Sequence, residues 1–131
     1  MIKKTLLALA ARCEAERPSS DLDDAIAEAL GWVNLNPTKM ALIGLRWRAP
    51  NGDTCYGCGP PAYTSSFDAA FTLKPEGWTV VNVSDIAGQE GNPMVELGNS
   101  TLTTYGNGPK GASLAIVFAA TALRAASLAQ L

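Results

Sequence analysis

The sequence contains no histidine. This absence excludes a Ser-His-Asp triad, a Cys-His dyad, the His-x-Glu deaminase site and the His-Glu-x-x-His zinc helix, because each of them needs an imidazole. A catalyst built from this chain would depend on carboxylates, lysine, a lone cysteine or an external metal. We therefore expect a protein that is not an enzyme, with no catalytic residues, no cofactor and no metal site.

Cysteine is scarce as well: the chain has Cys13, Cys55 and Cys58. An odd number without a secretory context favours reduced thiols in a bacterial cytoplasm. Cys55 and Cys58 have the spacing of half a zinc knuckle, but a structural zinc needs four ligands, which only a zinc shared between two copies would provide. We favour the interpretation that both are small residues of a loop.

The sequence also lacks a basic excess and a long apolar run. The net charge of -2 argues against a protein that binds nucleic-acid polymers, although a few local arginines can still bind a small anion. The apolar stretch 111–123 is shorter than the roughly twenty residues of a membrane span, so we expect a buried helix and no membrane partner. A signal peptide over residues 1–11 is disfavoured, because Arg12 interrupts the run and apolar residues recur at helical spacing.

Local patterns predict four helices and several strands in one domain spanning residues 1–131. Helices are expected over residues 3–16, from about 20 to a stop at Gly31, after a cap at Ser65, and after Pro109. A hairpin around Asn51-Gly52 would join strands 42–47 and 54–56, and further strands are expected at 78–83, 94–97 and 101–105. This order predicts an α+β fold with one antiparallel or mixed sheet that carries helices on both faces.

The third helix is predicted to be short and to face the core with aromatic residues. Phe67, Ala70 and Phe71 form its apolar stripe, and Pro75 and Gly77 end it. We predict that Phe71 is a core anchor.

The run Pro61 to Trp78 combines a polar cap, this short helix, a Pro-Glu-Gly stop and the start of a strand. It resembles the phage ABA (alpha-beta-alpha) sandwich domain family, most closely in Tyr63–Ala70 and Pro75–Trp78. Weaker similarity extends to residues 6–15, 22–23 and 122–126, and the Gly- and Asn-rich stretch 101–110 departs from the family pattern. The resemblance implies an alpha-beta-alpha sandwich and a small accessory protein of a tailed phage or prophage, made in the cytoplasm of the infected bacterial host. The family carries no assigned activity.

The segment Tyr63-Thr64-Ser65-Ser66 is the first candidate for a ligand site. It precedes a helix, whose amino terminus offers unpaired backbone donors, and the hydroxyls add more, so together they could hold a phosphate. The alternative is that Ser65 simply caps its own helix.

The second candidate is Arg46-Trp47-Arg48, where strand alternation puts two cations on one face and an indole on the other. Arginines and aromatic surfaces suit a base and its phosphates. The alternative places Trp47 in the core and both arginines in solvent. Tyr105, with the Gly106-Asn107-Gly108 loop, could close over the same ligand or simply belong to a turn.

Together these features lead us to expect an anti-defence protein that sequesters, without turnover, a phosphorylated nucleotide signal of host immunity, such as a cyclic dinucleotide or a form of cyclic ADP-ribose. Such a sponge is compatible with a homo-oligomer. The alternatives are a protein–protein inhibitor of a host defence complex, in the manner of an anti-CRISPR protein, and a minor virion component. The inhibitor would use a surface around Trp32 and the Asp21–Asp24 turn.

Overall fold

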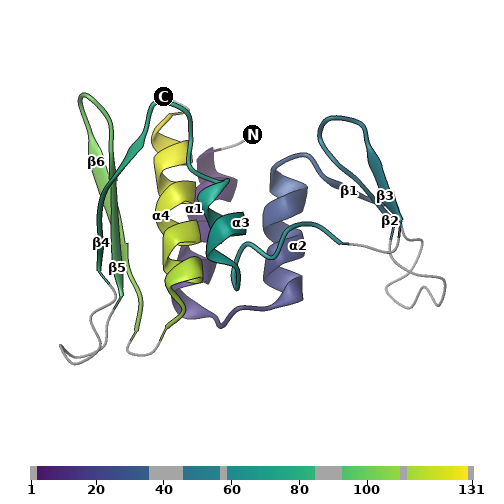
Figure 1. Cartoon of the computed structure of the whole chain (residues 1–131), viewed down its shortest axis with the longest axis horizontal. Helices are drawn as coiled ribbons and strands as arrows, with labels where there is room; N and C mark the ends of the chain where they lie inside the picture. Colours follow the sequence, from purple (N-terminus) through teal and green to yellow (C-terminus); the bar gives the residue numbers. More distant parts are fainter. Residues whose placement is uncertain (1–2, 36–45, 57–58, 85–92, 110–111, 130–131) are drawn as a thin grey trace.

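The computed structural model describes residues 3–35, 46–56, 59–84, 93–109 and 112–129, and the statements below concern these residues. Figure 1 shows the chain path. The elements, in chain order, are α1 (Lys3–Ala15), α2 (Ser20–Ala29), β1 (Val33–Asn34), β2 (Arg46–Arg48), β3 (Thr54–Tyr56), α3 (Phe67–Phe71), β4 (Thr79–Ser84), β5 (Met94–Gly98), β6 (Thr103–Asn107) and α4 (Leu114–Leu128).

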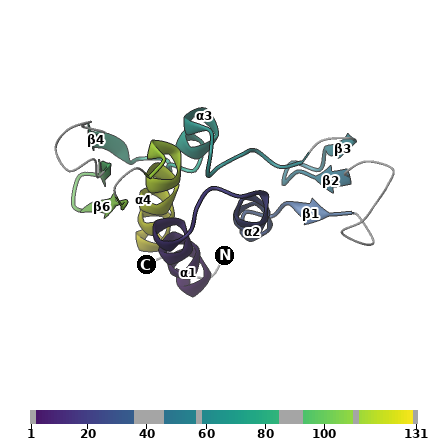
Figure 2. The same ribbon diagram turned by 90° about the horizontal axis from the view of Figure 1, so that it is seen from below.

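The predicted α+β class and the antiparallel strand pairing are confirmed, but the strands form two sheets where we expected one. The first sheet has the order β1-β2-β3 and the second has the order β4-β5-β6. They lie at opposite ends of the long axis of the molecule, with the helices between them (Figures 1 and 2). Pro60 and Pro61 follow β3 and have no N–H to donate, so that strand cannot extend its ladder toward the second sheet.

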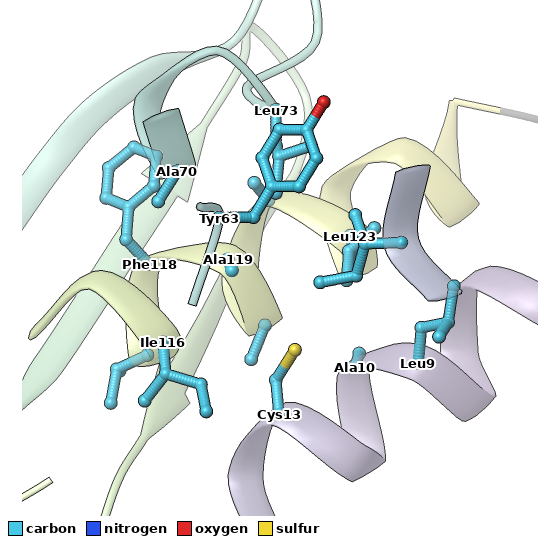
Figure 3. Close-up of a cluster of buried hydrophobic side chains, with 14 of the residues drawn as sticks. Leu9, Ala10, Cys13, Tyr63, Ala70, Leu73, Ile116, Phe118, Ala119 and Leu123 are labelled. Carbon is cyan, nitrogen blue, oxygen red and sulfur yellow. The ribbon is translucent and has the colours of Figure 1, made fainter. Parts of the chain in front are cut away.

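Helix α4 forms the centre of the molecule. Its residues from Ala115 to Leu123 are all buried, because α1 and α3 pack against it and strands β5 and β6 cover another side. Such a helix is apolar on every face. Figure 3 shows Ala10 and Cys13 of α1 in the same buried cluster as Ala119 and Leu123 of α4. The helix covers one face of the second sheet, whereas the first sheet contacts α2 through β1.

The local signals for helix ends and turns are largely confirmed. Gly31 follows α2 with a positive φ of 104°, as its predicted role as a stop signal requires. The hairpin between β2 and β3 turns through Asn51 and Gly52. The part of the first predicted hairpin strand that precedes Arg46 lies outside the described residues.

Two predictions about α3 are wrong. The capping side chain belongs to Ser66, whose Oγ accepts from the Ala69 N–H, and not to Ser65. Phe71 is 44% exposed and therefore is no core anchor. The helix has five residues, and it turns Ala70 inward while Phe67 and Phe71 rest on the buried ring of Phe118, with centroid distances of 5.1 and 5.6 Å.

Among the residues that the structure describes, no helix combines the length and the apolar character needed to cross a membrane.

Candidate functional site

Tyr63 and Thr64 lie in the interior, and their polar atoms serve the fold. The Thr64 N–H donates to the Asp23 carboxylate at 2.8 Å, and the Thr64 hydroxyl donates to the same oxygen at 2.7 Å. The Ser19 N–H donates to the Thr64 hydroxyl at 3.1 Å. Burial raises the pKa of the Tyr63 phenol. This network fixes the segment that precedes α3 against the start of α2, so the Thr64 donors are engaged within the protein.

Ser65 and Ser66 have different roles. Ser65 is exposed, whereas the Ser66 hydroxyl accepts the Ala69 N–H at 3.3 Å. A helix of five residues aligns few peptide dipoles, so its amino terminus exerts little attraction on an anion. The alternative interpretation, in which a serine caps its own helix, describes this segment once Ser66 replaces Ser65 as the cap.

Strand β2 has an exposed arginine, Arg48, and a buried tryptophan, Trp47. Trp47 is 1% exposed, so its ring cannot stack on a ligand, while Arg48 is exposed. The placement of Trp47 therefore follows the alternative stated for this strand. The register pairs Arg48 with Val33 and Thr54 across the sheet.

The register also reveals an aromatic position that the sequence reasoning missed. Arg46 pairs with Tyr56, and strand alternation puts the Arg46 and Arg48 positions on one sheet face. Directly opposed residues of an antiparallel pair share a face, so the Tyr56 position belongs to the arginine face. The signal was present in the sequence, because the Asn51-Gly52 turn sets the pairing that brings these positions together.

Tyr105 is 60% exposed on β6, in the sheet at the opposite end of the molecule from β2 (Figure 1). Its partner in the register is Glu96 of β5. The structure therefore separates the predicted site residues into three places: strand β2, the segment before α3, and strand β6. Tyr105 cannot close over a ligand held on β2.

A charged pair that the sequence did not reveal joins the two long helices. The Arg124 guanidinium donates to both oxygens of the Glu14 carboxylate, and one of these bonds measures 2.7 Å. The hydrogen bonds that Arg124 donates to the Glu14 carboxylate raise the pKa of Arg124. The pair ties α1 to α4 beside Gly106, and it engages this cation within the fold. Residues 110 positions apart carry no local signal of such a contact.

Metal and thiol chemistry find no support in the described part of the chain. There, no group of three or more cysteine, aspartate and glutamate residues is placed to hold a metal ion. Burial raises the pKa of the Cys13 thiol to about 12, which keeps it protonated and unreactive at neutral pH. Cys58 lies outside the described residues.

Comparisons with protein-family models, with curated proteins and with solved structures found no match to this chain. The function must therefore be argued from the residues themselves. Of the predicted site residues, Arg48 combines a charge with an exposed position, and it defines the candidate site: the sheet face that contains Val33, Arg48, Thr54 and the Arg46 and Tyr56 positions. We call this the arginine face.

Proposed function

We propose that this protein is a non-enzymatic phage accessory protein that sequesters a phosphorylated nucleotide signal of host immunity on the arginine face. Its working place would be the cytoplasm of the infected bacterium. The phage setting derives from the family resemblance of the Pro61–Trp78 segment. The ligand class derives from one observation: exposed Arg48 lies two residues from a second arginine position that pairs with an aromatic one.

The chemistry of the face suits a cyclic dinucleotide or a form of cyclic ADP-ribose. A guanidinium donates two parallel hydrogen bonds to a phosphate, and two such groups match a ligand with two phosphates. An aromatic ring supplies a stacking surface for a base. Thr54, opposite Arg48, adds a hydroxyl at the same exposed position of the sheet.

Calorimetry with a panel of cyclic dinucleotides and cyclic ADP-ribose forms tests the proposal. Arg48→Ala should weaken binding by about 10-fold to 100-fold, because a hydrogen bond to a charged group contributes about 1.5–3 kcal/mol. Arg17→Ala is the matched control, since it removes the same charge from an exposed position in the α1–α2 connection. Bound ligand should return chemically intact after denaturation. Failure of the whole panel to bind, or an equal loss in both variants, would refute the arginine face as the site.

A second candidate function, inhibition of a host defence protein, is favoured by the aromatic pair on α3. Phe67 and Phe71 are 38% and 44% exposed and sit side by side over Phe118, with 6.4 Å between their own ring centroids. Exposed aromatic clusters are typical of protein interfaces. The surface first expected for this role, around Trp32 and the Asp21–Asp24 turn, is less suitable because Leu22 and Asp23 are buried and Trp32 packs against the core.

Pull-down from host lysate separates the two functions. A stoichiometric protein partner that is lost with Phe67→Ser and retained with Arg48→Ala would favour inhibition. If both variants still capture the partner, neither the aromatic pair on α3 nor the arginine face is the surface that binds it.

A further inference from the structure

Strand β4 leaves an edge of the second sheet open. It pairs with β5 on one side, and the structure describes no strand on the other. Helix α4 packs on β5 and β6, so β4 extends beyond its cover, with Val80, Val81 and Val83 38%, 54% and 37% exposed. Proteins usually protect such an edge with charged residues or proline. The sequence Thr-Val-Val-Asn-Val-Ser of β4 contains neither.

A bulge gives this strand an unusual arrangement of faces. Val80 pairs with Leu97 and Asn82 pairs with Glu96, so Val81 is an extra residue on β4. In a regular strand, residues three apart point to opposite faces. The extra residue restores Val80 and Val83 to one face, which is the face of the buried Leu97 and Val95.

The remaining paired residues of β4 lie on the opposite face of the sheet from Val80 and Val83. Thr79, Asn82 and Ser84 pair with Gly98, Glu96 and Met94, which alternate with the buried positions of β5. The strand therefore has an apolar face with Val80 and Val83. Its other face has a hydroxyl residue at each end, and Val81 lies on this face beside Gly98.

We propose that β4 pairs antiparallel with β4 of a second copy of this chain, about a two-fold axis normal to the sheet. The strand reads nearly the same in both directions, so Val80 lies opposite Val83 of the other copy and Thr79 lies opposite Ser84. Such a pairing requires opposed residues to share a face. Because of the bulge, Val80 and Val83 share one face and Thr79 and Ser84 share the other, so both pairs meet this requirement. In a regular strand the two residues of each pair would point to opposite faces of the sheet.

The chemistry of the pairing favours a second copy over a different partner. In a two-fold contact any charge on the strand would be present twice near the axis, and β4 has no charge. Four valines would meet on the face of the sheet that carries α4, and the open backbone groups of both edges would be satisfied in a six-stranded sheet. A six-residue strand pair is a small interface, so we expect a dissociation constant in the micromolar range. This pairing is independent of the proposed nucleotide site, which lies at the other end of the molecule (Figure 1).

Sedimentation equilibrium over micromolar to millimolar concentrations tests the proposal. The mass should rise from 13.7 kDa toward twice that value. Val83→Lys should raise the dissociation constant by about tenfold or more, because each copy would place a charged side chain opposite Val80 of the other copy at an apolar contact. Val33→Lys is the matched control, since Val33 is 45% exposed on β1, an edge strand of the other sheet, and should leave the dimer intact. Circular dichroism checks that both variants are folded.

Disulfide trapping tests the register separately. Val80→Cys and Val83→Cys proteins, mixed and oxidised, should form a crosslinked dimer more readily than either protein alone, because residue 80 faces residue 83. The native cysteines are the same in all three samples. A wild type that stays monomeric, a dimer that Val83→Lys leaves unchanged, or crosslinking that mixing does not increase would overturn the proposal.

Discussion

Thr64 is a polar residue with no exposed surface, and it stabilises the fold through its hydrogen bonds to one carboxylate. Its N–H and its hydroxyl both donate to Asp23, which is itself 9% exposed. Thr64→Val keeps the shape of the side chain and removes one donor from a buried anion. We expect a loss of about 1–3 kcal/mol in the free energy of unfolding, measured with urea. Thr103→Val, at an exposed strand position, should change it little; equal effects would contradict a special role of the Asp23–Thr64 bonds.

Because of Cys13, we expect the free energy of unfolding to change with pH in the alkaline range. Burial raises the pKa of its thiol from 9.0 to about 12 in the folded protein. Well below pH 9 the thiol is protonated in both states, and its contribution to stability is complete. Between these pKa values only the unfolded chain loses the proton, so the stability of the folded state falls, by at most about 1.4 kcal/mol per pH unit.

The measurement compares the wild type with Cys13→Ala across this pH range. At neutral pH the wild type should be the more stable, because alanine leaves a space in the core. The difference in unfolding free energy should narrow above pH 9. A difference that stays constant with pH would show that the thiol is not protected by burial.

The alternation of side chains along β2 shows how much of a residue's position can be predicted from the sequence. It correctly indicates that Trp47 and Arg48 lie on opposite faces of the strand. It does not indicate which face the rest of the chain covers, because that depends on residues distant in sequence. Phe71 presents the same difficulty: helical spacing groups it with Ala70, but the buried side of so short a helix is set by contact with α4.

At the scale of elements, α3 depends on its cap. Ser66→Ala removes the acceptor of the Ala69 N–H, and we expect it to cost about 0.5–2 kcal/mol of stability. Ser65→Ala is the control, because this neighbouring serine is exposed and is not the cap. Thermal denaturation followed by circular dichroism makes the comparison. If Ser65→Ala were the more damaging change, the cap would belong to Ser65, as the sequence first suggested.

Helices and turns could be predicted here because their signals are local. Gly31 ends α2 through its own backbone freedom, and Asn51-Gly52 turns the β2–β3 hairpin within a few residues. Strand pairing beyond that hairpin could not be predicted with the same success. Whether β3 and β4 join one sheet depends on the direction that the chain takes through α3 and the prolines before it. The periodicity of apolar residues does not indicate this direction.

At the scale of the whole molecule, the separation of the two sheets decides what the candidate site can be. The predicted combination of Arg48, Ser66 and Tyr105 needs a fold that brings three distant segments together. The sequence supplied the α+β class, because that follows from the kinds of element present. It did not supply the distance between the sheets, and so it grouped residues that the structure places at opposite ends (Figures 1 and 2).

The same separation predicts uneven stability, which amide hydrogen exchange can measure. Helix α4 is buried by elements on several sides, whereas β3 pairs with β2, β2 pairs with β1, and β1 contacts α2. Segments with few buried apolar contacts open locally at a lower free energy than the global unfolding. We therefore expect faster exchange at Trp47 and Cys55 than at Val95 and Leu97. A nucleotide bound to the arginine face should slow exchange in β2 and β3 and leave β5 unchanged. Equal protection of both sheets would mean that the molecule opens as one unit, and that the first sheet is held by contacts beyond its link to α2.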